Sequence, residues 1–274
     1  MIFEPQPDTK DRWKMATTKM NPKQQKAREA FEKLLENTAQ ADRIYNENPD
    51  SRGGRIISTD IARYLDQRYR DTPKGQPKDL LPGWDCAWRY AQDRLLRELG
   101  GRGTREIVRF MAGGWAAGKT HALEYTTPPD LAWDGTLRDY RWASKTVDLA
   151  LSQGWLVDIA YVYRDIEIAL YGAVERAQKD GRSVPLGDLA MNHRAVQKSI
   201  LRLIQRYHEN IGVNFTLVHN TGMKGIAGKS LPISYDDLAF EGPLHYTETY
   251  ERYYGKAALE IENLNPAQGE IQGR

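Results

Sequence analysis

A glycine-rich loop between an apolar segment and a helical one is the feature that most constrains this fold. Residues 113–120 read Gly-Gly-Trp-Ala-Ala-Gly-Lys-Thr. The preceding residues, 106–112, are apolar and predict a buried strand, and the residues after the loop predict the start of a helix. A strand, a glycine-rich loop ending in Lys-Thr and a helix, in this order, predict a phosphate-binding loop of the Walker A pattern.

The residue types in this loop suit phosphate binding. Glycines let successive backbone N–H groups turn toward phosphate oxygens, and the following helix N-terminus adds partial positive charge. Lys119 would reach the β- and γ-phosphates of ATP, and the Thr120 hydroxyl would ligate Mg²⁺. The large Trp115 side chain either stacks on a substrate ring or packs against the protein. We assign nucleotide binding to Gly113, Gly114, Trp115, Ala116, Ala117, Gly118, Lys119 and Thr120.

Strand and helix patterns alternate along the rest of the chain. This alternation predicts an α/β fold in which a mostly parallel sheet is covered on both faces, giving three layers. Strands are expected at 55–60, 106–112, 131–134, 155–163 and 213–219, and helices at 22–47, 61–70, 84–99, after 120, before 153, at 166–179 and at 186–210.

Composition excludes several classes of protein. The 274 residues fit one large domain, or one domain with an appendage, and 39 Lys+Arg against 37 Asp+Glu give no sign of a general nucleic-acid or membrane-surface binder. The single cysteine, Cys86, permits neither an internal disulfide nor a Cys-based zinc site. We see no secretory signal and no apolar run of the ~18 residues that a membrane helix needs, so we expect a cytoplasmic protein.

We divide the chain into three parts. Residues 1–50 are expected to be an N-terminal helical extension, 51–254 the nucleotide-binding α/β domain and 255–274 a polar tail. The extension is either a helix packed on the domain or an inhibitory, partner-binding arm. A second glycine-rich stretch at 225–230 has its first glycine misplaced, and we interpret it as a basic loop.

Two carboxylates are candidates for binding Mg²⁺ or accepting a proton beside the loop. Asp60 and Asp134 each end a predicted strand, and carboxylates at strand ends point into the crevice where α/β folds bind ligands. One could orient Mg²⁺ and the other could accept a hydroxyl proton. The alternative for each is a helix N-cap, because helices are expected to begin at both places.

Two arginines flank a predicted turn. Arg176 and Arg182 could clamp phosphate during transfer, because mobile basic residues stabilise the charge that develops there. The alternative is two solvated arginines.

The residues after the loop resemble zeta-toxin-type P-loop kinases. The resemblance rests on Leu-Ala-Trp-Asp-Gly-Thr-Leu-Arg at 131–138, the apolar strand at 157–163, Arg176, Gly-Arg-Ser-Val-Pro at 181–185 and His193, and it spans roughly residues 55–220. It implies a P-loop kinase-like fold and phosphorylation of a sugar hydroxyl, with UDP-N-acetylglucosamine as the best-known substrate, and an antitoxin that restrains the kinase.

The resemblance also implies roles for individual residues. Lys119 and Thr120 would bind phosphate and Mg²⁺, and Arg176 and Arg182 would clamp ATP. The side of the second substrate would be lined by Asp134, Thr136 and Arg138.

The chain departs from the family pattern in the order of its segments. The family places a catalytic Asp-x-x-Arg strand between the loop helix and the Asp-Gly-Thr strand, but about a dozen residues separate Thr120 from Asp134 here. The stretch Ile-Ile-Ser-Thr-Asp-Ile-Ala-Arg at 56–63 resembles that strand, moved ahead of the loop. A parallel sheet tolerates such a permutation because each strand–helix unit packs locally. Asp60 would then be the general base, and Arg63 would contact the substrate or a phosphate.

These observations favour an ATP- and Mg²⁺-dependent kinase acting on a nucleotide-sugar or another nucleotide-like metabolite. The alternatives are a P-loop NTPase switch and a nucleotide-binding protein without an acceptor. The expected partners are the small-molecule acceptor and an antitoxin or other inhibitory partner, with neither nucleic acid nor membrane.

Overall fold

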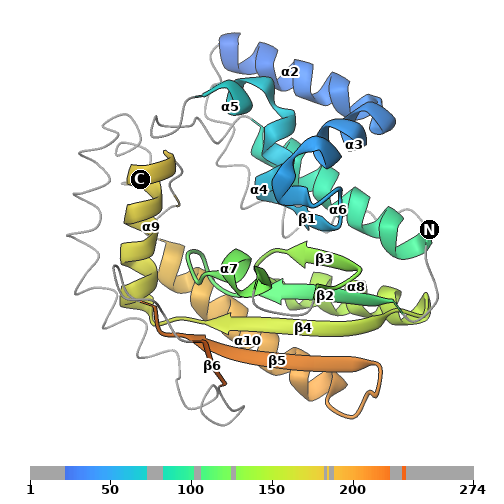
Figure 1. Cartoon of the computed structure of the whole chain (residues 1–274), viewed down its shortest axis with the longest axis vertical. Coiled ribbons are helices and arrows are strands. Elements are labelled where there is room, and N and C mark those ends of the chain that lie inside the picture. The colour runs from blue at the N-terminus through green and yellow to red at the C-terminus, as the bar shows by residue number, and fades with distance from the viewer. Residues whose placement is uncertain are drawn as a thin grey trace.

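Apolar segments of the chain form a mostly parallel six-stranded sheet (Figure 1). The strand order is β1-β3-β2-β4-β5-β6, in which the first five strands are parallel and β6 is antiparallel to β5. β2 lies between β3 and β4, so the loop that follows it opens in the middle of the sheet's carboxyl edge. The strands are β1 (Ile56–Ser58), β2 (Ile107–Ala112), β3 (Leu131–Asp134), β4 (Leu156–Tyr163), β5 (Val213–Asn220) and β6 (Ser230–Pro232).

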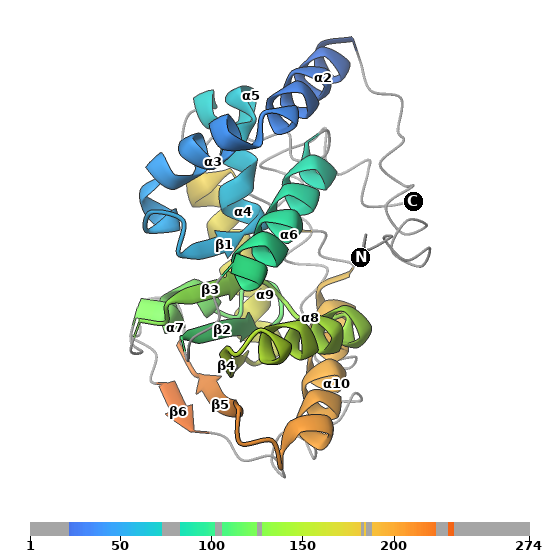
Figure 2. The same cartoon turned by 90° about the vertical axis from the view of Figure 1, so that its right-hand side faces the viewer.

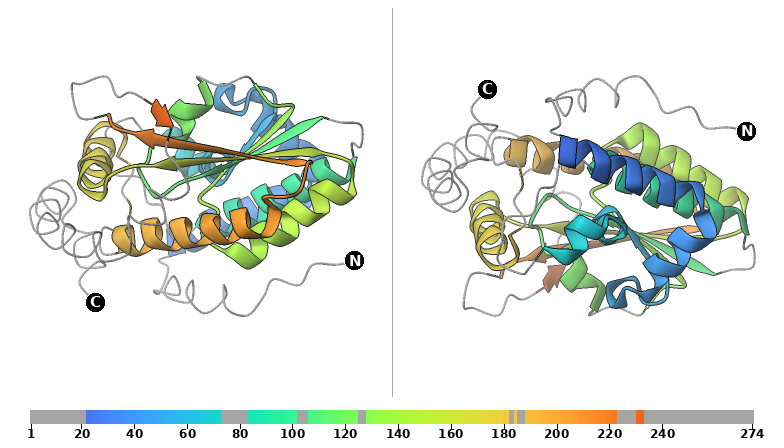
Figure 3. Two further views of the ribbon diagram at one scale, coloured as in Figure 1. Left: turned by 90° about the horizontal axis from the view of Figure 1, so that it is seen from below. Right: turned by 90° about the horizontal axis from the view of Figure 1, so that it is seen from above.

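Helices lie on both faces of this sheet, as the three-layer prediction requires. Figure 3 shows α6, α8 and α10 along one face and the shorter α7 on the other. The helices are α2 (Pro22–Glu36), α3 (Thr38–Glu47), α4 (Thr59–Ala62), α5 (Gln67–Asp71), α6 (Trp84–Gly101), α7 (Lys119–Glu124), α8 (Tyr140–Ser152), α9 (Ile166–Asp180) and α10 (Leu189–Tyr207), with 3-10 turns at Pro49–Ser51 and Arg63–Leu65.

The computed structural model describes most of the predicted α/β domain. The predicted tail at 255–274 lies outside the described residues, and so does most of the predicted basic loop at 225–230. Within the described part, no helix has both the length and the apolar character needed to cross a bilayer. The described residues are 22–72, 83–101, 106–124, 128–181, 184, 188–222 and 230–232.

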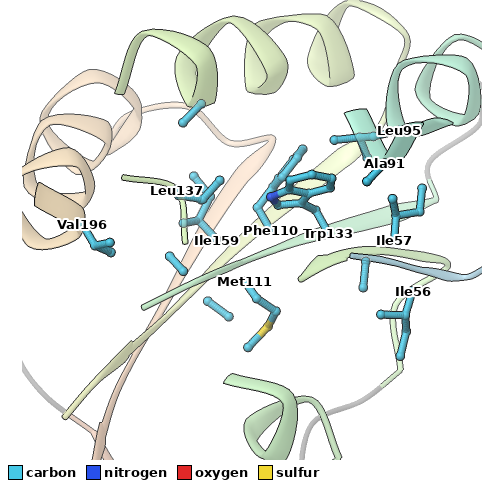
Figure 4. Close-up of a cluster of buried hydrophobic side chains, with 14 of the residues drawn as sticks. Ile56, Ile57, Ala91, Leu95, Phe110, Met111, Trp133, Leu137, Ile159 and Val196 are labelled. Atoms are coloured by element: carbon cyan, nitrogen blue, oxygen red, sulfur yellow. The ribbon is translucent and has the colours of Figure 1, made fainter. Parts of the chain in front are cut away.

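The two faces of the sheet carry alternating side chains, as strand geometry demands. Figure 4 shows Phe110 and Trp133 on the side of α6, near Leu95, whereas Met111 points to the opposite face. All four side chains are buried in one hydrophobic cluster. The P-loop strand is therefore fixed from both sides, which is what a strand in the middle of a parallel sheet requires.

A buried ion pair joins β2 to β4. Arg109 Nε donates to Asp158 Oδ2 at 2.6 Å, and the Asn214 amide and the Thr216 hydroxyl of β5 donate to the other oxygen of Asp158 at 3.0 and 3.2 Å. A buried carboxylate with three donors is satisfied, so this cluster links the three strands without leaving an uncompensated charge.

The N-terminal segment differs from its prediction. A single helix over 22–47 was expected, but α2 ends at Glu36 and α3 begins at Thr38. The side chain of Asn37 accepts a hydrogen bond from the Gln40 N–H at 3.1 Å and so caps α3. Figure 2 shows α2 to α5 grouped beyond the β1 edge of the sheet. Phe31 and Tyr45 of this group are buried in the same cluster as the sheet.

Two other elements also differ from their predictions. The helix expected at 61–70 is broken into α4, a 3-10 turn and α5, because the Asp66 side chain caps α5 through the Arg68 N–H. The strand ending at Asn220 was expected to be the last, but β6 follows it and pairs with β5 in the antiparallel sense.

Tyr45 closes the outer edge of β1. Its hydroxyl accepts from the Ser58 N–H at 2.9 Å and donates to the Ile56 carbonyl at 3.0 Å. In the described part of the chain β1 pairs only with β3, so these two backbone groups have no strand partner. The Tyr45 hydroxyl therefore supplies the two hydrogen bonds that a further strand would make to β1. These bonds lie just before Asp60 in the chain.

We expect Tyr45→Phe to destabilise the protein by about 1–3 kcal/mol, because it leaves a buried N–H and a buried carbonyl without partners. Urea unfolding at neutral pH measures this change. Tyr171→Phe, at an exposed position of α9, is the control and should change stability by less than ~0.5 kcal/mol. Equal effects of the two substitutions would contradict the role given to Tyr45.

Candidate functional site

The loop after β2 turns tightly around its own backbone. Gly113 and Gly118 have φ angles of 153° and 89°, and Ala116 has a φ of 59°. A side chain at Gly118 would collide with the Asn220 amide, and one at Gly114 would collide with the His193 ring. Close packing therefore requires glycine at both Gly114 and Gly118. The positive φ of Gly118 also favours glycine there.

Lys119 begins α7 and reaches back across the loop. Its Nζ donates to the carbonyls of Gly113 and Gly114 at 3.1 and 3.0 Å. Burial lowers the pKa of Lys119, the charge of Asp134 opposes that shift, and the charge of Arg176 adds to it. The charge of Asp60 also opposes the shift, so charged groups from three other elements act on the Lys119 side chain.

Thr120 and Asp134 form an oxygen pair beside this lysine. The Thr120 hydroxyl donates to Asp134 Oδ2 at 3.0 Å. Asp134 lies opposite Met111 in the β2–β3 register, next to the start of the loop. Burial raises the pKa of Asp134, Lys119 lowers it, and the negative charge of Asp60 raises it further.

The pair suits Mg²⁺ by its chemistry. Mg²⁺ prefers oxygen ligands and usually binds one or two carboxylates together with substrate phosphates and water. The described residues contain no group of three or more His, Cys, Asp or Glu side chains able to hold a metal ion. Thr120 and Asp134 offer oxygen ligands of the kind that Mg²⁺ takes alongside substrate phosphates.

Asp60 lies in the first turn of α4, two residues past β1, and does not end the strand as predicted. Its carboxylate is about half exposed and lies 3.8 Å from Nη1 of Arg63. Arg63 is buried, with its guanidinium 4.7 Å from the centre of the Tyr69 ring. The charge of Asp60 influences both Lys119 and Asp134, so the structure brings the two predicted carboxylates to one place.

Neither carboxylate caps a helix. The N-cap of α4 is Ser58, whose hydroxyl accepts from the Asp60 N–H at 3.2 Å. The N-cap of α8 is Asp139, and Asp134 bonds Thr120 instead. The capping alternative is therefore wrong for Asp60 and for Asp134.

Most of the other predicted residues, namely Arg176, Thr136 and Arg138, lie in the described part of the chain. Arg176 is half-buried on α9, whose chain begins just after β4, and its charge influences Lys119 and Asp134. The Thr136 carbonyl accepts from the Gly113 N–H at 3.5 Å, and Arg138 follows it, half-buried. Arg182 lies outside the described residues.

A second set of polar residues holds the loop from outside, and sequence reasoning gave it no role. The Trp115 N–H donates to Asn192 Oδ1 at 3.1 Å, and the Trp115 side chain packs against the hydrophobic core. His193, Arg164 and Asn220 contact the loop carbonyls that follow. Arg164 and Asn220 stand at the ends of β4 and β5, so their place on the carboxyl edge is the signal that could have identified them.

His193 is a neutral donor in this site. Its Nε2 lies 2.8 Å from the Trp115 carbonyl, which can only accept, so Nε2 carries the hydrogen. Burial lowers the pKa of His193 to about 4, the hydrogen bond to Trp115 opposes this shift, and the charges of Lys119 and Arg164 add to it.

The stability of the protein should therefore depend on pH through His193. Its folded pKa of about 4 lies below the ordinary value of 6.5. Its contribution is fully present above pH 6.5 and is lost as the pH falls toward 4, by about 3 kcal/mol in all. Urea unfolding of the wild type and of His193→Gln between pH 7 and 4 measures this difference. His208→Gln, at an exposed position, should leave the wild-type pH dependence unchanged.

Comparison with known proteins found a family profile that matches part of the chain. Residues 129–222 match the sequence profile of the family described as Zeta toxin. The matched segment includes Asp134, Thr136, Arg138 and Arg176, whereas the loop at 113–120 and Asp60 precede it. No curated protein matches the chain.

Among solved structures, one reported with the PezAT chromosomal toxin-antitoxin system of Streptococcus pneumoniae is similar at 14% identity. The similarity covers 76% of this chain and 75% of that chain, with a TM-score of 0.37. The family profile agrees with the resemblance inferred from the motifs at 131–138 and 157–163. Residues 129–222 are therefore similar in sequence to the Zeta toxin family.

Proposed function

We propose that this protein is an ATP-dependent phosphotransferase of the zeta-toxin type. It transfers the γ-phosphate of ATP to a hydroxyl of a nucleotide-sugar, such as UDP-N-acetylglucosamine, or of another nucleotide-like metabolite. The observation that carries the proposal is electrostatic: Lys119, Asp134, Asp60 and Arg176 come from four different elements, and their charges act on one another. Two cations and two carboxylates at the mouth of a P-loop are the groups that phosphoryl transfer needs.

The loop and the cations bind and neutralise phosphate. Backbone N–H groups of the loop, among them those of Ala116 and Gly118, hold the β- and γ-phosphates. Lys119 exchanges its bonds to the loop carbonyls for bonds to phosphate oxygens. Arg176 and Arg182 balance the negative charge that develops on the transferred group. The partial burial of Lys119 strengthens this effect, because charges interact more strongly where water is excluded.

Thr120 and Asp134 would hold Mg²⁺ together with the phosphates. The ion, when bound, draws charge from the phosphate oxygens and aligns them. The proximity of the two side chains, 3.0 Å between Thr120 Oγ1 and Asp134 Oδ2, supports this assignment.

Asp60 is the general base of the proposal. Its carboxylate accepts the proton of the acceptor hydroxyl while the hydroxyl oxygen attacks the γ-phosphorus and the bond to the β-phosphate oxygen breaks, which leaves ADP. The half-exposed position of Asp60 permits an acceptor to approach it. Arg63, Thr136 and Arg138 line the acceptor side.

The proposal includes the organisation of the chain and a partner. It divides the chain into an extension at 1–50, a kinase-like domain at 51–254 and a tail at 255–274, and Phe31 and Tyr45 of the extension pack in the same cluster as the sheet. A kinase with a toxic activity requires restraint, so an antitoxin or another inhibitory protein is the expected macromolecular partner, in the cytoplasm.

The test is phosphate transfer from ATP, with Mg²⁺, to a panel of nucleotide-sugars and nucleotides, followed by mass spectrometry. We expect a product heavier by one phosphoryl group. Lys119→Ala and Asp60→Asn should each reduce its formation at least 100-fold, because one loses phosphate neutralisation and the other loses the base. Only Lys119→Ala should also weaken nucleotide binding.

Asp71→Asn is the matched control, because Asp71 is an exposed aspartate at the end of α5. This variant should transfer phosphate at the wild-type rate. ADP formation without any phosphorylated acceptor, at a rate unaffected by Asp60→Asn, would contradict the kinase and favour an NTPase switch.

A further inference from the structure

Three consecutive carbonyls of the loop each accept a hydrogen bond from a side chain outside it. His193 Nε2 bonds the Trp115 oxygen at 2.8 Å, Arg164 Nη1 bonds the Ala116 oxygen at 2.8 Å, and Asn220 Nδ2 bonds the Ala117 oxygen at 2.9 Å. We call His193, Arg164 and Asn220 the carbonyl brace. They come from α10 and from the ends of β4 and β5, between 48 and 103 residues away from their partners.

The brace fixes the direction of the loop's N–H groups. In a trans peptide the carbonyl of one residue and the N–H of the next point in opposite directions. Holding the carbonyls of residues 115–117 outward therefore turns the N–H groups of Ala116 and Gly118 toward the inside of the loop, while the Ala117 N–H bonds the Gly114 carbonyl at 3.2 Å. That is the arrangement in which a glycine-rich loop binds phosphate.

The brace residues are themselves held in place. Arg164 uses Nη2 to bond the Gly222 carbonyl at 2.6 Å, and Asn220 Oδ1 accepts from the Gly222 N–H at 3.1 Å. His193 is only 2% exposed. Its ring and the Asn220 amide fill the space beside Gly114 and Gly118. The brace therefore leaves the loop little room to relax outward.

We propose that His193, Arg164 and Asn220 are positioning residues that keep the loop in its phosphate-binding conformation before a nucleotide arrives. The proposal rests on the proposed function, since it takes nucleotide phosphate as the ligand of the loop. A protein whose binding conformation is only partly populated binds its ligand more weakly in proportion to that fraction. Loss of a brace contact thus raises the Kd and the KM for ATP, but leaves kcat at saturating ATP unchanged.

The test uses pairs of variants that differ in one hydrogen bond. His193→Gln keeps an N–H donor, whereas His193→Leu removes it at similar size. We expect His193→Leu to raise the KM for ATP and the Kd for ADP about tenfold, which corresponds to one hydrogen bond of ~1.4 kcal/mol. Its kcat should stay within twofold of the wild type, and His193→Gln should keep a KM near the wild-type value.

Coupling between brace residues provides a second test. Because His193 and Asn220 hold the same loop, the double variant His193→Leu/Asn220→Leu should raise the Kd for ADP by less than the product of the two single effects. If His193→Leu does not fold, Asn220→Leu with Asn220→Gln as its conservative partner gives the same comparison.

Hydrogen exchange separates the brace from the proposed function. Without nucleotide, peptides covering residues 113–118 should exchange faster in His193→Leu than in the wild type, whatever reaction the protein catalyses. Faster exchange with weaker ADP binding supports the brace even if no acceptor is phosphorylated. Unchanged exchange, or a lower kcat at an unchanged KM, overturns it. The proposed function fails on a different result, namely ADP formation that is unaffected by Asp60→Asn and leaves no acceptor phosphorylated.

Discussion

The reversal of the chain at the end of β2 is the constraint on which the rest of this structure depends. Six residues, 113–118, must turn from a buried strand into α7. Gly113 and Gly118 supply backbone angles that other residues rarely adopt. The same turn directs the carbonyls of residues 115–117 to its outer side. Buried carbonyls need hydrogen-bond donors. His193, Arg164 and Asn220 provide them.

Four charged groups interact beside the loop. The charges of Asp60 and Arg176 act on the pKa of both Lys119 and Asp134, and Lys119 and Asp134 act on each other. Burial works against the charged forms of both Lys119 and Asp134, so this arrangement costs stability that a well-packed apolar cluster would not. The proposed nucleotide and its cation would be the ligands for which such a site retains these charged groups.

Local patterns in the sequence predicted much of the fold and part of the site. The strand at 131–134 has its predicted bounds, because a short apolar run followed by Asp-Gly favours a strand that ends in a turn. The contact of Thr120 with Asp134 follows from two motifs on neighbouring parallel strands. The break at Asn37 was missed because a side-chain cap competes with continuation of the helix, and periodicity does not register such a cap.

The brace could not be predicted, for a different reason. Its members are single polar residues on α10, β4 and β5, and nothing in their local sequence says which distant carbonyl each one meets. Asp60 shows the same difficulty at short range. It was predicted to end a strand, but β1 ends two residues earlier because Ser58 caps the start of α4. Long-range contacts of this kind are decided by packing, not by propensity.

The place of β1 at the sheet edge has a consequence for the order of assembly. During synthesis β1 emerges before the P-loop, yet its only strand partner in the described part of the chain, β3, emerges after it. Pairing of strands so far apart in sequence is slow, and it follows the formation of local contacts. Asp60 therefore reaches Asp134 only after residues 107–134 have been made and have joined the sheet. A partly synthesised chain thus carries Asp60 without Asp134 beside it, so the complete candidate site exists only in the folded protein.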